Sequence, residues 1–202
     1  MEKSNLEILK EFAKSTNRSI IDTEIPYPKT GYRTFVQYKR MIYIPNNKEN
    51  TSYFVFFSDP YAKVGMPTDF CGAFIKLPAK YNSELNIRSK NILDKVNVFS
   101  NTKSNKIGSD YFDSKTIISG NLDHSLKSLL LSMKIQNQLS EALKIEELIR
   151  ISINEYKIDF IPELKGSPYL SIINPQSWNL DESFIEQVFT NIEKTRDIIY
   201  NN

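Results

Sequence analysis

The residues best suited to nucleophilic or acid–base chemistry in this chain are its single histidine, His124, and its single cysteine, Cys71. His124 lies between Asp123 and Ser125, and these three residue types form the catalytic triad of many hydrolases. Neighbouring side chains on a helix point about 100° apart, so these three cannot form a triad with one another. The sequence also lacks the strained G-x-S-x-G turn that exposes a hydrolase serine.

The surrounding segment, "GNLDHSLKSLLLS" (residues 120–132), has the features of a helix N-terminus. Asn121 is a preferred N-cap residue, and Asp123 in the first turn favours the positive end of the helix dipole. Each of these polar residues has a structural role that requires no chemistry. The segment therefore predicts the start of a helix.

Cys71 and His124 could still act as nucleophile and base if the fold brought them together at an open cleft. However, Cys71 lies in the apolar segment "DFCGAFIKL", and cysteine is among the most frequently buried residue types. A buried structural thiol is the favoured interpretation, and the pair remains an alternative.

Metal and cofactor sites have little support in the sequence. One histidine and one cysteine cannot build an ordinary structural zinc site. Asp110 and Asp113 in "GSDYFDS" are the best candidates for a magnesium or calcium site, but the segment is more typical of a solvated turn than of an EF-hand loop. Neither a Walker A sequence nor G-x-G-x-x-G occurs, so we expect no cofactor.

One segment, residues 71–109, is strongly basic, with seven basic residues and only two acidic ones. The basic residues are Lys76, Lys80, Arg88, Lys90, Lys95, Lys103 and Lys106. Together they could bind nucleic acid, anionic lipid or an acidic partner. The favoured alternative is that these lysines lie on solvated strand edges, where they discourage edge-to-edge pairing.

Composition places the chain among soluble globular proteins. It has 202 residues, of which 40% are hydrophobic and 25% charged, with 12 Phe, 11 Tyr and only 6 Gly. A net charge of +2 argues against a dedicated nucleic-acid binder. A single cysteine fits a reducing compartment, and no run approaches the roughly 20 apolar residues that span a bilayer. We therefore expect a cytoplasmic protein without a transmembrane segment.

Helical patterns occur at three places in the chain. Ser4 and Glu7 form a capping-box pattern that begins an amphipathic helix ending near Ser15. A second helical region, residues 122–144, is interrupted near Ser132. The third, residues 180–200, follows a cap pattern of Asn179 and Glu182 and carries an apolar stripe. The stripe consists of Phe184, Val188, Ile192 and Ile199.

Strand patterns predict several hairpins. Residues 34–44 and 52–57 read as a hairpin around "PNNKEN", whose second strand is apolar on both faces and therefore central. Residues 71–78 with 84–89, and 147–153 with 157–162, read as two more pairs. Single strands are predicted at residues 95–100, 115–120 and 168–174.

These patterns predict a single α+β domain over residues 1–202. Its antiparallel sheet combines with a short N-terminal helix, a broken central helix and a C-terminal helix. Residues 1–30 form the N-terminal helix and a lead-in segment.

From about residue 68 to 200 the order of elements resembles an uncharacterised family of bacterial domains. The resemblance rests on "FCGAFIKLP", "YFDSKTIISGNLDHSLKSLLLSMKIQNQLSEAL", "LIRISINEYKIDFIP" and the closing helix. Within it, Phe112, Ser119 and Asn121 match an F-x-x-x-x-x-x-S-x-(N/D) strand that enters a helix, and Ser132 matches the second cap. The resemblance implies a soluble α+β module, often found after membrane helices, with no assigned activity.

Three functions follow as hypotheses. The first is a non-enzymatic binding or protein-interaction module, of adaptor or immunity type, whose partner is another protein. The second is an enzyme whose site assembles from distant residues that include Cys71 and His124. The third is peripheral binding to an anionic surface through the basic residues between 76 and 106, helped by the N-terminal helix.

Overall fold

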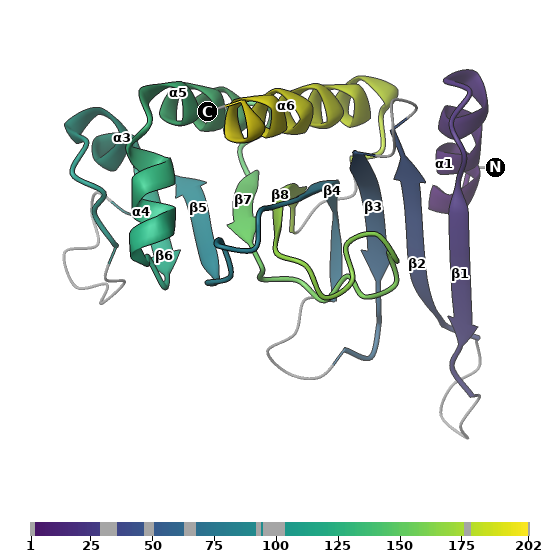
Figure 1. The fold of residues 1–202 in the computed structure, drawn as a ribbon. Coiled ribbons are helices and arrows are strands. Elements are labelled where there is room, and N and C mark those ends of the chain that lie inside the picture. The colour runs from purple at the N-terminus through teal and green to yellow at the C-terminus, as the bar shows by residue number, and fades with distance from the viewer. Residues whose placement is uncertain are drawn as a thin grey trace.

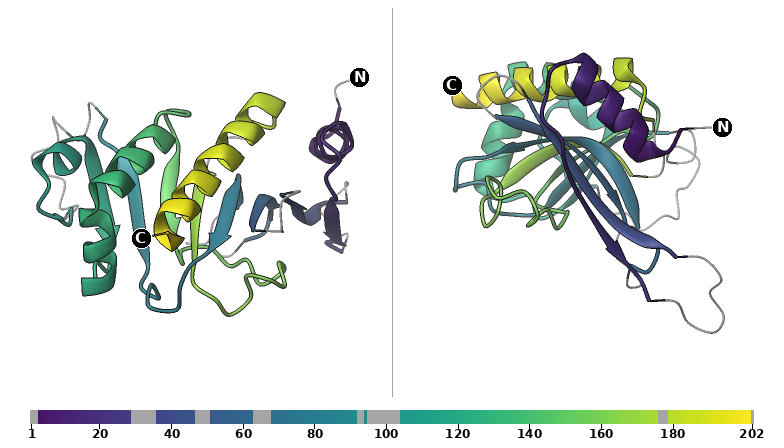
Figure 2. Two further views of the ribbon diagram at one scale, coloured as in Figure 1. Left: turned by 45° about the horizontal axis from the view of Figure 1, so that its top comes forward. Right: turned by 90° about the vertical axis from the view of Figure 1, so that its right-hand side faces the viewer.

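A computed structural model describes residues 3–28, 36–46, 51–62, 68–91, 94, 104–175 and 179–201. The fold is an eight-stranded antiparallel sheet with helices gathered on one face (Figures 1 and 2). This architecture confirms the predicted α+β class. Among the described residues, no helix combines the length and apolar character needed to cross a membrane.

The sheet has the spatial order β1-β2-β3-β4-β8-β7-β5-β6. Its strands are β1 (Ile21–Pro26), β2 (Tyr38–Pro45), β3 (Ser52–Ser58), β4 (Asp69–Lys76), β5 (Leu85–Ser89), β6 (Thr116–Gly120), β7 (Arg150–Ile153) and β8 (Tyr169–Asn174). The last strand, β8, lies between β4 and β7 and joins the N-terminal strands β1–β4 to the group β5–β7.

The helices occur where their patterns predict them, with one addition. They are α1 (Asn5–Ser15), α3 (Asp110–Lys115), α4 (His124–Leu131), α5 (Met133–Ala142) and α6 (Glu182–Tyr200). The capping box that begins α1 is confirmed: the Glu7 amide donates to Ser4 Oγ at 3.3 Å, and the Ser4 amide donates to the Glu7 carboxylate at 2.8 Å. The predicted break at Ser132 separates α4 from α5.

The central strands β3, β4 and β8 are buried on both faces, which explains their continuous apolar sequence. One face packs against α1, α4, α5 and α6, whose stripe residues Phe184, Val188 and Ile192 belong to this helix-side core. The other face packs against the segment between β7 and β8. In β3 the two faces alternate, so that Phe54 lies in the helix-side core and Tyr53 in the opposite core.

The predicted pairing of residues 71–78 with 84–89 is wrong. These residues form β4 and β5, which do not pair: β4 pairs with β3 and β8, whereas β5 pairs with β6 and β7. A short connection favours a hairpin on local grounds. Here the apolar strands β3 and β8 occupy both edges of β4, so the chain continues past them to a separate position in the sheet.

The predicted hairpin of residues 147–153 with 157–162 is also wrong. Residues 157–162 form turns, in which the Ile161 amide donates to the Ile158 carbonyl at 2.9 Å. β7 pairs instead with β8. The apolar residues Ile158, Ile161 and Leu164 recur every third position, and this spacing lets the turns place all three against the sheet.

Two elements were not predicted, and some predicted features differ in detail. β1 lies at the sheet edge within the predicted lead-in segment and is mostly exposed, so it has no alternating apolar pattern. The six-residue α3 contains Asp110 and Asp113, whose segment is typical of a solvated turn in the sequence. The cap of α6 is Asp181, so the predicted cap pattern at Asn179 is corrected. The strand predicted at residues 95–100 lies outside the described residues.

Gly72 provides a test of the packing between β4 and β8. Its φ is +155°, and an added Cβ would lie 2.2 Å from the Ile172 carbonyl oxygen and 2.6 Å from Ile173 Cα. We expect Gly72→Ala to lower the free energy of unfolding by about 3 kcal/mol or more, because backbone atoms of a central strand must move. Urea denaturation followed by circular dichroism measures this change.

Gly108→Ala is the matched control. Gly108 also has a positive φ, of +95°, but nothing lies within 4 Å of its added Cβ. We expect Gly108→Ala to lower the free energy of unfolding by only about 1–2 kcal/mol, the strain of a side chain at positive φ. Equal costs for the two variants would contradict the close approach of β4 and β8.

Candidate functional site

The structure separates the two candidate catalytic residues. Cys71 lies on β4 in the helix-side core with no exposed surface, and its Sγ is 3.9 Å from the Asn179 carbonyl oxygen. Burial raises the pKa of this thiol to about 12, so it stays protonated near neutral pH. His124 is exposed at the start of α4, near the β6 end of the sheet (Figure 1). Cys71 is therefore not available at an open cleft.

The segment around His124 is a helix start, as predicted, but its cap residue differs. Asp123 is the N-cap of α4 and accepts hydrogen bonds from the Leu126 amide at 2.8 Å and from Ser83 Oγ at 2.6 Å. These hydrogen bonds lower the pKa of Asp123, and the one from Ser83 has the largest effect. Asn121, the predicted cap, instead donates to Ser83 Oγ at 3.2 Å.

The candidate metal ligands Asp110 and Asp113 both lie in α3. Asp110 is exposed in the first turn, whereas Asp113 accepts hydrogen bonds from the Ile107 and Gly108 amides at 3.2 and 3.0 Å. The Asp113 carboxylate therefore fastens the preceding loop to the helix. In the part of the chain that the structure describes, no group of three or more His, Cys, Asp or Glu side chains could hold a metal ion.

The described basic residues of the 76–106 segment lie in two places. Lys76 and Lys80 lie near the end of α6: the Tyr200 hydroxyl donates to the Lys76 carbonyl at 3.1 Å, and Lys80 lines a hollow with Ile198 and Ile199. These lysines form the first group.

The second group lies beside α3. Lys90 Nζ and Lys106 Nζ both donate to the Asp113 carbonyl, at 2.8 and 3.2 Å. Arg88 on β5 pairs with Asp94 at 2.6 Å, and this hydrogen bond raises the pKa of Arg88. Lys95 and Lys103 lie outside the described residues. Among the described lysines of the segment, Lys76 and Lys80 thus lie near α6, whereas Lys90 and Lys106 contact α3.

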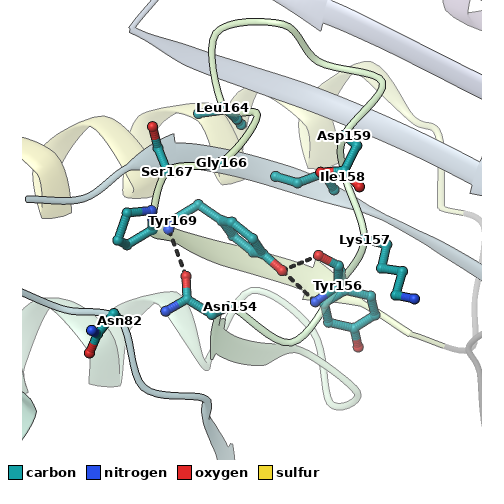
Figure 3. A pocket seen from close by; sticks show the side chains of 11 residues that line it. Asn82, Asn154, Tyr156, Lys157, Ile158, Asp159, Leu164, Gly166, Ser167 and Tyr169 are labelled. Carbon is teal, nitrogen blue, oxygen red and sulfur yellow. Dashed lines mark hydrogen bonds between the residues drawn. The ribbon is translucent and has the colours of Figure 1, made fainter. Parts of the chain in front are cut away.

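The clearest site-like feature is a pocket of about 290 Å³ on the sheet face opposite the helices (Figure 3). We name it the 154–169 pocket, because residues of the segment between β7 and β8 form most of its wall. It is lined by Asn82, Asn154, Tyr156, Lys157, Ile158, Asp159, Leu164, Gly166, Ser167, Pro168 and Tyr169.

Hydrogen bonds hold the floor of this pocket in one arrangement (Figure 3). The Tyr169 hydroxyl donates to the Tyr156 carbonyl and accepts from the Tyr156 amide. Asn154 Oδ1 accepts from the Tyr169 amide at 2.9 Å. The Asn154 side-chain amide also donates to the carbonyls of Tyr81 and Ser83 at 3.0 and 3.1 Å. Three chain segments are thereby joined through one asparagine.

The two phenols at this pocket, Tyr156 and Tyr169, are both buried. Burial, the largest effect on each, raises the pKa of Tyr156 and of Tyr169 far above the ordinary value for tyrosine. Both hydroxyls therefore stay protonated at neutral pH. The Tyr169 hydroxyl and the Asn154 amide serve the structure of the pocket, which leaves its polar rim to meet a ligand.

The rim carries polar side chains of different kinds. Asn82, Lys157 and Asp159 are exposed and Ser167 is half-buried. Among the described residues, no hydrogen bond or ion pair engages the side chains of these four. A ligand at the pocket would therefore meet an amide, an ammonium group, a carboxylate and a hydroxyl.

The sequence does not predict this pocket, because its pattern at residues 157–162 predicts a strand. The available signal was the threefold spacing of Ile158, Ile161 and Leu164, followed by the turn residue Gly166. No recognised motif carries that signal.

Comparison with known proteins adds no relatives: the chain matches no protein-family model, no curated protein and no solved structure. The resemblance to an uncharacterised family of bacterial domains therefore stays a prediction.

The burial of Cys71 leads to a chemical prediction. We expect a chromogenic disulfide reagent to label Cys71 only as the protein unfolds, because the thiol is enclosed and protonated. The folded protein holds this thiol protonated, and ionisation of the thiol in the unfolded chain favours unfolding. The contribution of Cys71 to the free energy of unfolding is therefore fully present below the usual thiol pKa of about 8.5 and is lost as the pH rises toward about 12. Absorbance during labelling measures the rate, with the denatured chain as control. Equal rates for the folded and denatured chains would contradict the burial.

The hydrogen-bonded floor is tested by Tyr169→Phe. This variant leaves a buried amide and a buried carbonyl of Tyr156 without their partner, so we expect the free energy of unfolding to fall by about 2 kcal/mol. Tyr200→Phe is the matched control, because the Tyr200 hydroxyl makes its 3.1 Å hydrogen bond at the exposed surface. Its cost should stay within about 0.5 kcal/mol. Denaturant titration of both variants compares them, and equal costs would refute the proposed role of Tyr169.

Proposed function

We propose that this protein is a non-enzymatic binding module that recognises another protein through the 154–169 pocket. The observation that carries the proposal is the contrast within this pocket. Its floor is held by Asn154, Tyr156 and Tyr169, whereas the polar side chains of its rim have no partner among the described residues.

A fixed floor favours binding on energetic grounds. Association costs free energy for each side chain or loop that must be ordered, and a preorganised site reduces this cost. Binding residues commonly lie on loops that a rigid scaffold positions. The 154–169 segment fits this pattern, because Tyr156, Ile158, Ile161 and Leu164 anchor it to the sheet.

The dimensions and chemistry of the pocket favour a protein partner. The pocket has a volume of about 290 Å³. A hollow of this size suits one anchoring side chain of a partner. Its surroundings match the interface arrangement of an apolar centre with a polar rim, here Ile158 and Leu164 with Lys157 and Asp159.

The alternative enzyme that pairs Cys71 with His124 receives no support from this arrangement, because the thiol lies in the core. The proposed role is that of an adaptor or immunity-type protein. Its single cysteine, which fits a reducing compartment, supports a cytoplasmic location as part of the same proposal.

The test is capture of a partner from the native host by the tagged protein and by a charge-reversed rim variant, Lys157→Glu with Asp159→Lys. We expect the unaltered protein to retain a stoichiometric partner and the variant to retain at least about tenfold less, because mismatched charges oppose association. Quantitative mass spectrometry of soluble and detergent-solubilised fractions measures the retained amounts.

A matched variant, Lys134→Glu with Glu147→Lys, makes the same charge exchange at exposed positions outside the pocket. It should retain the partner fully, and circular dichroism checks that both variants fold. Capture of the same partner by the rim variant at an unchanged level would place the interface elsewhere. The absence of any stoichiometric partner would count against a protein-binding function.

A further inference from the structure

A second pocket lies where α3, β6 and the end of α5 meet, and its lining is basic. Its volume is about 320 Å³, and we name it the lysine pocket. It is lined by Lys90, Lys115 and Lys144, by the hydroxyl-bearing residues Ser89, Tyr111, Ser114, Thr116 and Ser140, and by Leu143. Among the described residues that line it, none is acidic.

Backbone and side-chain contacts hold two of the lysines in place. The Lys90 amide donates to the Lys115 carbonyl at 2.8 Å, and Lys90 Nζ donates to the Asp113 carbonyl at 2.8 Å. Lys115 Nζ lies 3.8 Å from the centre of the Tyr111 ring, a cation–π contact. The side chains of Lys90, Tyr111 and Lys115, from two segments of the chain, therefore line the same pocket.

The third lysine, Lys144, pairs with Glu141 at 2.6 Å, and both side chains are more than half exposed. An exposed pair of this kind contributes little to stability, so an anion can displace Glu141 at small cost. Of the other nearby carboxylates, Asp113 accepts two hydrogen bonds from its preceding loop, and Asp94, whose charge interacts with Lys90, pairs with Arg88 at 2.6 Å. Asp110, in the first turn of α3, is exposed. Neither Asp110 nor Asp113 lines the pocket.

We propose that the lysine pocket binds a phosphomonoester. Ammonium groups and hydroxyls supply the donors that a phosphate group requires, and charge-assisted hydrogen bonds of this kind are the strong ones. The half-exposed ring of Tyr111 offers a flat surface to the organic part of such an ester. This site is separate from the 154–169 pocket, so the proposal does not depend on the proposed function.

The experiment is isothermal titration calorimetry of the full chain with inorganic phosphate and with adenosine monophosphate, in buffers of low and of physiological salt. We expect both probes to bind at low salt and to bind more weakly as salt screens the lysines. Tighter binding of the nucleotide than of phosphate would identify an organic ester as the ligand. Equal binding would limit the site to the phosphate group and overturn the ester proposal.

Two variants, Lys115→Gln and Lys144→Gln, test the residues. Each should weaken binding about tenfold, the ratio expected for the loss of one charge-assisted hydrogen bond. Lys134→Gln is the matched control, because Lys134 is exposed on α5 and does not line the pocket. It should leave the affinity unchanged, and circular dichroism confirms that all three variants fold.

Two results would overturn the proposal. The first is that the unaltered protein binds neither probe at low salt. The second is that Lys115→Gln and Lys144→Gln bind as tightly as the control. Because neither variant touches the 154–169 pocket, failure here leaves the capture of a protein partner unaffected.

Discussion

The fold depends on the insertion of β8 between β4 and β7. All six residues of β8 are buried, and the strand pairs along both of its edges. Without it, no strand pairing in the sheet would join β1–β4 to β5–β7. The close approach at Gly72, where a side chain on β4 would meet the β8 backbone, shows how tightly this joint is made. A strand from the end of the sequence thus completes a sheet begun near its start.

The same insertion creates the 154–169 pocket. β7 and β8 are neighbours in the sheet, but the segment between them is too long for a tight hairpin, so it folds across the open face. Its apolar residues complete the second core there. Tyr169, the first residue of β8, then closes the floor by its hydrogen bonds to Tyr156. The element that unites the sheet also sets the geometry of its candidate binding surface.

The two pockets differ in the chemistry that they offer. The rim of the 154–169 pocket carries both charges, from Lys157 and Asp159, which suits the mixed surface of a protein. The lysine pocket carries three ammonium groups and several hydroxyls, which suits a compact anion. They lie on different parts of the sheet and use no residue in common, so the two proposed binding functions are independent of each other.

Features that depend on residues a few positions apart could be predicted from the sequence. The capping box of α1, the break at Ser132 and the two-sided burial of β3 follow from local hydrogen bonds and apolar periodicity. The burial of Cys71 followed in the same way from its apolar strand. Two predictions from local patterns were wrong: the pairing of β4 with β5, and the strand at residues 157–162.

The strand order, the position of β1 and the meeting of Lys90, Lys115 and Lys144 at one pocket depend on contacts between distant segments, so they could not be predicted from the sequence. Strand pairing depends on which strands the whole fold brings alongside: β4 pairs with β3, which precedes it, and with the distant β8, and not with β5, which follows it. The N-cap of α4 is Asp123, which also accepts a hydrogen bond from Ser83 of another segment. Both pockets join residues far apart in the sequence, so no local pattern could reveal them.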